Sequence, residues 1–389
     1  MHSLRTVLKD FKIIRPRFEV KQEIALQWLG ACHAQAEEYK RQSVGARTEE
    51  LTSYVRLFQR FGCNPERIGK RGTELSDVKQ TNLKEMEIFS PTAFSDENMS
   101  RGFPGLSITG RNRFFEKVVN TRVKELFEQD LEAPPHLIHV SCTGYVSPSP
   151  PQTLVQSRGW NRQTSITHAY HMGCYASLPA VRIANGFVNS GATRVEILHN
   201  ELCTLHLDLT DHSPEQLVVQ SLFADGHIRY TAVEGDSSDR GLEVFTIREE
   251  ILPDTLDQMT WAPWEWGMRM TLSRNVPQQI SEVVRGFVDR MLNTADLPSS
   301  DSLPELIFAI HPGGPRIIDQ IQTELKLRDN QVVHSKSTLF NYGNMSSATL
   351  PHIWKALLED DSIPNGQWIV SLAFGPGLTT FGSVMRKRC

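Results

Sequence analysis

The sequence lacks the cysteine spacing of a disulfide framework. Six cysteines are scattered over 389 residues, and none belongs to a C-x-x-C pair. They are Cys32, Cys63, Cys142, Cys174, Cys203 and Cys389. Thiols spaced in this way are typical of proteins kept reduced, so we expect free cysteines and no structural disulfide.

Long apolar runs and a strong charge imbalance are missing too. The first thirty residues are interrupted by charged side chains, unlike a secretory signal, and no later stretch reaches the ~20 apolar residues of a membrane span. The 41 basic and 45 acidic residues give a formal charge of -4, which disfavours general nucleic-acid binding. We therefore expect a cytoplasmic globular protein without integral membrane association.

Short apolar segments alternate with amphipathic ones along most of the chain, the pattern of an α/β fold. Helices are expected at 22–41, 49–61, 111–131, 176–188, 214–224, 277–292, 316–327 and 346–358, and strands at 4–14, 137–141, 194–199, 306–310 and 367–373. The turn-rich stretch 234–240 interrupts this alternation. It predicts two linked α/β halves, residues 1–235 and 236–389, although no internal repeat is evident in the sequence.

The segment around Cys174 has the features of a nucleophile site. The cysteine follows a glycine and precedes a helix of small and apolar residues. The unpaired N–H groups and the dipole at a helix N-terminus favour the thiolate, which is the nucleophilic form. A buried core thiol fits the same pattern, so this segment alone does not decide between the two interpretations.

Two further turns carry a histidine and an asparagine. The apolar strand Ile307–Ile310 ends at His311, which is followed by Pro-Gly-Gly-Pro, and Asn344 lies in a turn that opens a helix. Taken singly, these residues also fit a core histidine and a helix N-cap. Together with Cys174 they match the set of groups that activates a nucleophilic thiol.

The same residues permit two alternatives. His311 follows Cys174 by 137 residues, a spacing that papain-like proteases share, but the wider papain signature is absent. His168, His171 and Cys174 have H-x2-H-x2-C spacing. A structural zinc ion needs four ligands, and no second cluster supplies the rest, so we predict no metal.

As a set, these motifs resemble those of the type III polyketide synthases, the chalcone synthase-like branch of the thiolase superfamily. The matching segments are Met172–Ala176, His311–Pro315, Gly343–Ala348 and Phe374–Thr379. The resemblance covers roughly residue 50 to the end. It implies a thiolase fold, with two related αβαβα halves that form a five-layered core. Residues 1–235 would carry the cysteine, and residues 236–389 would carry the histidine and asparagine.

The resemblance also implies a mechanism. Cys174 would take a starter acyl group from coenzyme A, and His311 would hold the thiol as thiolate by ion pairing. His311 and Asn344 would then bind malonyl-CoA, and donors placed where charge develops would stabilise the enolate left by decarboxylation. No metal or other cofactor is needed, because coenzyme A thioesters are substrates.

Further positions follow from the resemblance. Phe223 matches a gatekeeper residue, and Met270 stands where many plant members have phenylalanine. The predicted substrate-binding residues are Phe223, Met270, Thr143, Cys203, His206, Ser346, Phe374 and Gly375. The segments Glu201–His206 and Trp261–Met270 look more like those of bacterial alkylpyrone or alkylresorcinol synthases than like those of plant chalcone synthases. A pyrone or resorcinol-type product is therefore expected.

A basic stretch precedes these motifs. Arg56, Arg60, Arg67, Lys70 and Arg71 stand close together, and the family binds the phosphates of coenzyme A here. Arg60 aligns best, and Arg56 and Arg67 are further candidates. If these residues do not bind coenzyme A, they form a solvated helix face. The resemblance implies a homodimer that uses acyl-CoA and malonyl-CoA. The competing functions are a single-condensation ketoacyl synthase, a papain-like cysteine hydrolase and a non-catalytic acyl-CoA-binding protein.

Overall fold

The computed structural model describes residues 5–44, 52–91, 105–235, 239–297 and 303–389. The helices are α1 (Gln22–Val44), α2 (Thr52–Phe61), α3 (Ile108–Leu126), α4 (Pro150–Ser157), α5 (Ser177–Asn189), α6 (Pro214–Leu222), α7 (Val276–Thr294), α8 (Pro315–Leu325), α9 (Asp329–Tyr342) and α10 (Thr349–Glu359). The strands are β1 (Thr6–Ile14), β2 (Phe18–Lys21), β3 (Lys70–Thr73), β4 (His136–Ser141), β5 (Ser165–Tyr170), β6 (Val195–Leu202), β7 (Asp225–Glu234), β8 (Gly241–Ile251), β9 (Met259–Pro263), β10 (Met268–Leu272), β11 (Ile307–Ile310), β12 (Trp368–Gly375) and β13 (Thr379–Arg388).

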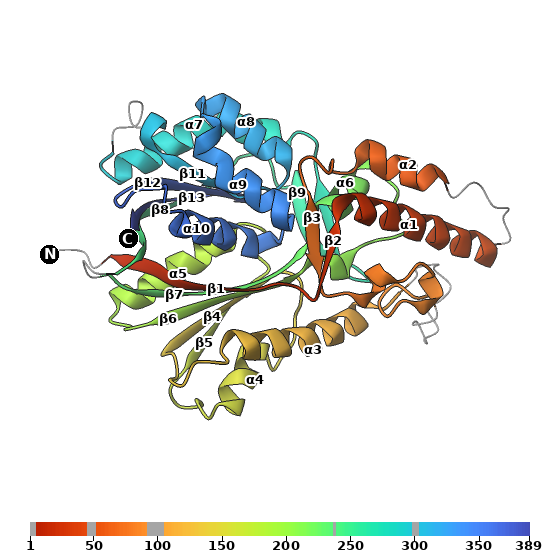
Figure 1. The fold of residues 1–389 in the computed structure, drawn as a ribbon, viewed down its shortest axis with the longest axis horizontal. Helices are drawn as coiled ribbons and strands as arrows, with labels where there is room; N and C mark the ends of the chain where they lie inside the picture. Colours follow the sequence, from red (N-terminus) through yellow and green to blue (C-terminus); the bar gives the residue numbers. More distant parts are fainter. Residues whose placement is uncertain (1–4, 45–51, 92–104, 236–238, 298–302) are drawn as a thin grey trace.

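Helices and strands alternate in layers (Figure 1). Helices α7 and α8 cover one outer surface, α3 and α4 cover the other, and α5 and α10 lie between the two groups of strands. The sheet order is β11-β12-β13-β8-β1-β7-β6-β4-β5. The large sheet is continuous because β1 and β8 pair at Val7 with Glu243 and at Leu8 with Leu242.

The two halves of this sheet have the same order when they are followed outward from the β1–β8 pair. One half continues β8-β13-β12-β11, and the other continues β1-β7-β6-β4 before adding β5. In both, the first two pairings are antiparallel and the third is parallel. This common topology confirms two related α/β halves. The boundary at 235/236 stays a prediction, since residues 236–238 lie outside the described part of the chain.

The central helices are buried because their sequences are apolar almost all round. Ala180, Val181 and Ala184 of α5 are fully buried, and they belong to one core cluster with Leu350 and Trp354 of α10. Full burial of such an aliphatic side chain contributes about 1.5–3 kcal/mol, so this layer joins the two halves firmly.

Several predicted bounds need correction. Helix α3 ends at Leu126, five residues before the predicted end, and Leu131 is 90% exposed. The predicted helix 346–358 begins as a 3-10 turn, Ser346–Ala348, before α10. Strands β2, β3, β5, β7, β8, β9, β10 and β13 and helices α4 and α9 were not predicted. Predicted residues 4 and 49–51 lie outside the described ranges.

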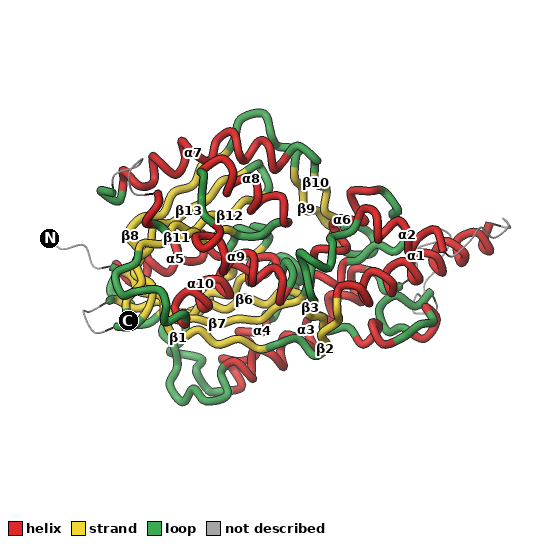
Figure 2. Tube along the Cα trace, turned by 45° about the horizontal axis from the view of Figure 1, so that its top comes forward, coloured by secondary structure: helices red, strands yellow, loops and turns green. Residues whose placement is uncertain are grey.

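Helices α1 and α2 project from the layered body, and the β9–β10 hairpin stands beside α6 (Figure 2). This hairpin and α6 supply much of one side of the cavity described below. Within the described ranges, no helix combines the length and the apolar character needed to cross a membrane.

Candidate active site

Cys174 lies in the turn that leads into α5, as the sequence predicts, and it is 7% exposed. The C-terminal loop supports this turn. A Cβ atom on Gly375 would lie 2.0 Å from Cδ1 of Tyr175, and one on Gly173 would lie 3.0 Å from Cδ of Pro376. Only glycine at 375 permits such a close approach, so the two segments pack directly together.

Burial keeps the two titratable groups of the predicted set neutral near pH 7. Burial raises the pKa of Cys174 to about 12, although hydrogen bonds with Ser346 and Asn344 act in the opposite direction. Burial lowers the pKa of His311 to about 3. Both ring nitrogens of His311 are buried and have no hydrogen-bond partner among the described residues. The predicted thiolate–imidazolium pair therefore stays a prediction.

Asn344 connects the three predicted segments. Its side chain acts on Cys174 by lowering the pKa of the thiol, and its Nδ2 donates to the carbonyl of Gly313 in the His311 turn over 3.4 Å. Its backbone N–H donates to Leu222 over 3.0 Å, and its carbonyl accepts from Ala224 over 2.8 Å. These contacts join Asn344 to Cys174 directly, and to the His311 turn and the Phe223 segment through their neighbours.

A cavity with about 620 Å³ of empty space, mouth included, opens beside Cys174. We call one side the polar wall; it consists of Cys142, Thr143, Cys203 and Ser346. A second group of lining residues, which we call the apolar wall, consists of Val219, Met259, Trp261, Trp266, Met268 and Met270. His206 and Phe223 also line the cavity, so one pocket contains most of the predicted substrate-binding residues.

Glu201 organises the polar wall from behind. Its carboxyl accepts from the N–H of Cys142 over 3.1 Å and from Oγ1 of Thr143 over 2.8 Å, and the Ser347 hydroxyl also donates to it. The thiol of Cys142 lies 3.1 Å from Oγ of Ser346. Burial raises the pKa of Glu201. The polar wall is therefore a hydrogen-bonded unit built from three separate segments.

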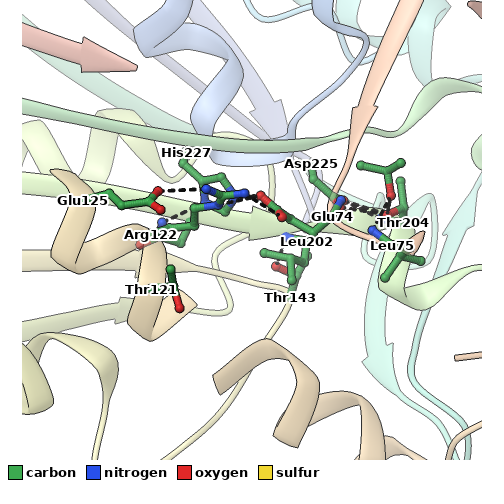
Figure 3. Close-up of polar contacts among 12 residues, drawn as sticks. Glu74, Leu75, Thr121, Arg122, Glu125, Thr143, Leu202, Thr204, Asp225 and His227 are labelled. Carbon is green, nitrogen blue, oxygen red and sulfur yellow. Dashed lines mark hydrogen bonds and ion pairs between the residues drawn. The ribbon is translucent and has the colours of Figure 1, made fainter. Parts of the chain in front are cut away.

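A second buried network centres on Asp225 and Glu74 (Figure 3). The Asp225 carboxylate accepts from the N–H of Thr204 over 2.9 Å and from the N–H of Glu74 over 2.7 Å. Glu74 in turn pairs with Arg122 over 2.8 Å and with His227 over 3.1 Å. Burial raises the pKa of Asp225 to about 7. These contacts fix the backbone that presents Cys203 to the cavity.

The apolar wall is attached to the polar wall through backbone carbonyls. Nε1 of Trp261 donates to the carbonyl of Cys142 over 2.7 Å. Nδ1 of His206 accepts from the N–H of Met268 over 3.0 Å, so Nε2 carries the proton and donates to the carbonyl of Thr143 over 2.7 Å. His206 also packs edge-on against Trp261. The neutral imidazole is thus hydrogen-bonded to both walls.

Two predicted substrate-binding residues lie outside the cavity lining. Phe374 belongs to a hydrophobic core cluster, and Gly375 faces Tyr175, while the next residue, Pro376, lines the cavity instead. The sequence did not single out Cys142, Glu201 or Trp266 as site residues. Cys142 could have been suspected only because it is next to Thr143, a predicted substrate-binding residue.

Some arginines of the basic stretch are exposed to solvent, and others are held by neighbouring groups of the protein. Arg56 and Arg60 are exposed, and Arg60 lies over the ring of Phe61. Arg67 makes two hydrogen bonds with Asp319, of 3.1 and 2.8 Å. Arg71 points inward and is 7% exposed, so it is not available to a phosphate in solvent.

No group of three or more potential ligands is arranged to hold a metal ion in the parts of the chain that the structure describes.

Comparisons with known proteins place the chain among condensing enzymes. A family model, chalcone and stilbene synthases, C-terminal domain, matches residues 243–388. Type III polyketide synthase C of Arabidopsis thaliana is 30% identical over 259 residues, which are 65% of this chain and 67% of the relative. The 1,3,6,8-tetrahydroxynaphthalene synthase of Streptomyces griseus is 28% identical over 71% of this chain and 74% of its own length. Probable polyketide synthase 1 of Dictyostelium discoideum is 28% identical over 81% of this chain, but the match spans 11% of that longer protein.

Solved structures establish the fold. The C-terminal type III polyketide synthase domain of Steely1 from Dictyostelium superposes with a TM-score of 0.81 at 23% identity, covering 99% of this chain and 100% of that domain. The two related halves therefore have the thiolase fold. The chain belongs to the chalcone and stilbene synthase family, the type III polyketide synthases. It is accordingly an acyl-transferring enzyme.

Proposed function

We propose that the chain loads an acyl-CoA starter onto Cys174 and extends it by decarboxylative Claisen condensation with malonyl-CoA. The observation that carries this proposal is Asn344, whose side chain lowers the pKa of Cys174 and also donates to the carbonyl of Gly313 in the His311 turn. In the loading step, His311 accepts the thiol proton while sulfur attacks the starter thioester. The carbon–sulfur bond to coenzyme A breaks, and the departing thiolate takes that proton.

Extension uses the side chains of His311 and Asn344 as hydrogen-bond donors. Loss of carbon dioxide from malonyl-CoA leaves an enolate, whose charge develops on the thioester oxygen. Nδ2 of Asn344 makes only a 3.4 Å hydrogen bond, and the ring nitrogens of His311 make none to the described residues, so both groups are free to donate to that oxygen. The carbanion then attacks the acyl group on Cys174, which forms the new carbon–carbon bond and releases the thiolate.

The lining of the cavity favours an apolar starter, and we propose a cyclised product of the pyrone or resorcinol type. The apolar wall offers aromatic and methionine side chains, and methionine adapts to irregular shapes. Phe223 and Met270 would narrow the passage between coenzyme A and the cavity, while Trp261 and His206 would limit the length of the chain inside it. A single-condensation ketoacyl synthase remains the alternative outcome.

Arg60 and Arg56 would bind the phosphates of coenzyme A, because both are exposed cations on α2. Arg67 would contribute less, since Asp319 already holds it. We expect Arg60→Ala to raise KM for malonyl-CoA about tenfold and Arg67→Ala to raise it less, with kcat retained in both. Equal effects of the two substitutions would contradict this assignment.

A homodimer is also proposed, because β5 ends the nine-stranded sheet and one of its edges has no neighbouring strand within the described chain. The mass in solution, measured by light scattering, tests this; a monomer at micromolar concentration would exclude it.

The decisive experiment supplies malonyl-CoA and acyl-CoAs of several chain lengths, with mass spectrometry of protein adducts and products. We expect the starter on Cys174 and products that carry two or more malonyl-derived units. A product with one unit would indicate a ketoacyl synthase. Cleavage of peptides without condensation, or binding of acyl-CoA without transfer, would reject the proposal.

A further inference from the structure

Arg71 is a buried cation that forms no ion pair with a carboxylate of the described residues, although the buried Asp225 is near enough to act against the lowering of its pKa. It lies on β3, and its guanidinium donates to three neutral acceptors: Oε1 of Gln22 over 2.7 Å, the carbonyl of Gln220 over 2.8 Å and the carbonyl of Phe223 over 2.7 Å. No carboxylate of the described ranges lies within ion-pair distance of it. Burial lowers the pKa of Arg71 to about 10, so the side chain stays charged at neutral pH.

Two of these acceptors are backbone carbonyls at the C-terminal end of α6: Gln220 lies in its last turn and Phe223 directly follows it. The last four carbonyls of a helix lack intrahelical donors, and cations are favoured at that end of the dipole. Gln22 completes the arrangement, because its Nε2 donates to the carbonyl of Ser221 over 2.8 Å. Arg71 and Gln22 together therefore fix the backbone at which α6 changes into the extended segment that carries Phe223.

The same segment is paired with the turn that carries Asn344. Phe223 and Asn344 form a parallel β-bridge, closed by the hydrogen bonds from Asn344 to Leu222 and from Ala224 to Asn344. Gly343 has a φ of 75°, and a Cβ atom there would lie 2.9 Å from Cγ of Arg71. The alkyl part of Arg71 thus packs on the residue before Asn344, while its guanidinium holds the carbonyl of Phe223.

Stability alone gives little reason for a charge at this position. Taking a guanidinium out of water is costly, and apolar replacements of buried charged groups are often as stable or more so. A planar group with several donors does offer what an apolar side chain cannot, which is a fixed direction for two carbonyls at once.

We propose that Arg71 is a positioning residue that sets Asn344 and Phe223 in register, so that the Asn344 amide faces the malonyl thioester during decarboxylation. This inference rests on the proposed function. It assigns Arg71 to the extension step, whereas loading of the starter depends on Cys174 and His311.

The test separates two partial reactions. Carbon dioxide release from malonyl-CoA reports on Asn344, and starter acylation of Cys174, followed by mass spectrometry, reports on the thiol. For Arg71→Met we expect decarboxylation to fall at least tenfold while the rate of acylation falls less than threefold. Arg71→Lys, which keeps one cationic donor, should recover part of the loss. In Arg71→Ala, millimolar methylguanidinium should restore decarboxylation several-fold.

Arg229→Met serves as the matched control, because Arg229 is another buried arginine but pairs with Asp130 on the side of α3. It should lower the melting temperature and leave the ratio of the two partial reactions unchanged. The proposal is overturned if decarboxylation and acylation fall together in the Arg71 variants in proportion to lost stability, or if Arg71→Met decarboxylates like the wild type. Absence of decarboxylation in the wild type would instead refute the proposed function.

Discussion

The polar wall and the apolar wall face the same cavity but are held by different forces. The polar wall depends on hydrogen bonds that converge on one buried carboxyl, Glu201. The apolar wall depends mainly on packing, with hydrogen bonds from Trp261 to Cys142, from Met268 to His206 and from Gln216 to Met270. A hydrogen-bonded wall tolerates little change of atom type, whereas a packed wall tolerates change of shape. We therefore assign chemistry to the first and substrate choice to the second.

The strongest test of this division is Cys174→Ala. Without the thiol no covalent intermediate can form, so product formation should fall by more than about 1000-fold. Cys389→Ala is the matched control, since Cys389 is the exposed cysteine, and it should keep wild-type acylation. Mass spectrometry of the protein after incubation with acyl-CoA measures both. An acyl adduct on the Cys174→Ala protein would show that Cys174 is not the acylated residue, and would contradict the assignment of the chemistry to this side of the cavity.

Glu201→Gln should disturb the polar wall next most strongly. An amide NH2 cannot accept a hydrogen bond, so one set of buried donors loses its acceptor, at about 1–3 kcal/mol for each unsatisfied group. We expect turnover to fall about tenfold or more, since 1.4 kcal/mol corresponds to a factor of ten. Glu196→Gln, which changes another buried carboxyl of β6, should lower the melting temperature without changing the products. Equal kinetics in the two variants would show that Glu201 acts on stability alone.

Trp261→Ala should change which acyl-CoA starter is preferred, while the condensation reaction itself is retained. Removing the indole enlarges the cavity and leaves the polar wall in place, so longer acyl-CoA starters should gain about tenfold in kcat/KM relative to short ones. Trp264→Ala provides the control, because Trp264 lies on the same hairpin and is 47% exposed. Competition between starters of two lengths measures the shift. A general loss of activity with unchanged preference would contradict the assignment.

The smallest effect is expected from His206→Gln, which tests the two hydrogen bonds that His206 makes between the walls. Burial lowers the pKa of His206 to about 3, whereas the unfolded chain binds its proton near pH 6.5. The stability from His206 is thus complete above pH 6.5 and decreases as the pH falls toward 3, by about 1.4 kcal/mol per unit. From pH 7.5 to 5.5 the wild type should lose about 1 kcal/mol more than the variant, measured by urea unfolding. Parallel pH dependences would show that the imidazole is not buried as a neutral group.

The residues of the predicted catalytic set could be found because each lies in a short motif. Glycine and proline mark the turns around Cys174, His311 and Asn344, and these turns are local properties of the sequence. Glu201 could not be recognised in that way. Its partners Cys142 and Ser347 are separated from it by 59 and 146 positions, so only the fold shows that they meet.

Arg71 shows how a local pattern can mislead. Its neighbours made it resemble part of a phosphate-binding cluster, but alternate residues of a strand face opposite sides. On β3, Lys70 pairs with Glu19 at the surface while Arg71 enters the interior. Strand β7 was missed for a related reason, because its polar residues are satisfied by distant partners: His227 by Glu74 and Arg229 by Asp130.

The contact between Gly375 and Tyr175 has a consequence for how the enzyme is made. A ribosome synthesises the turn that carries Cys174 long before it reaches Gly375, and domains fold as their segments emerge. Cys174 therefore acquires its final surroundings only after Gly375 has left the ribosome. A growing chain that already contains the thiol is not yet an enzyme.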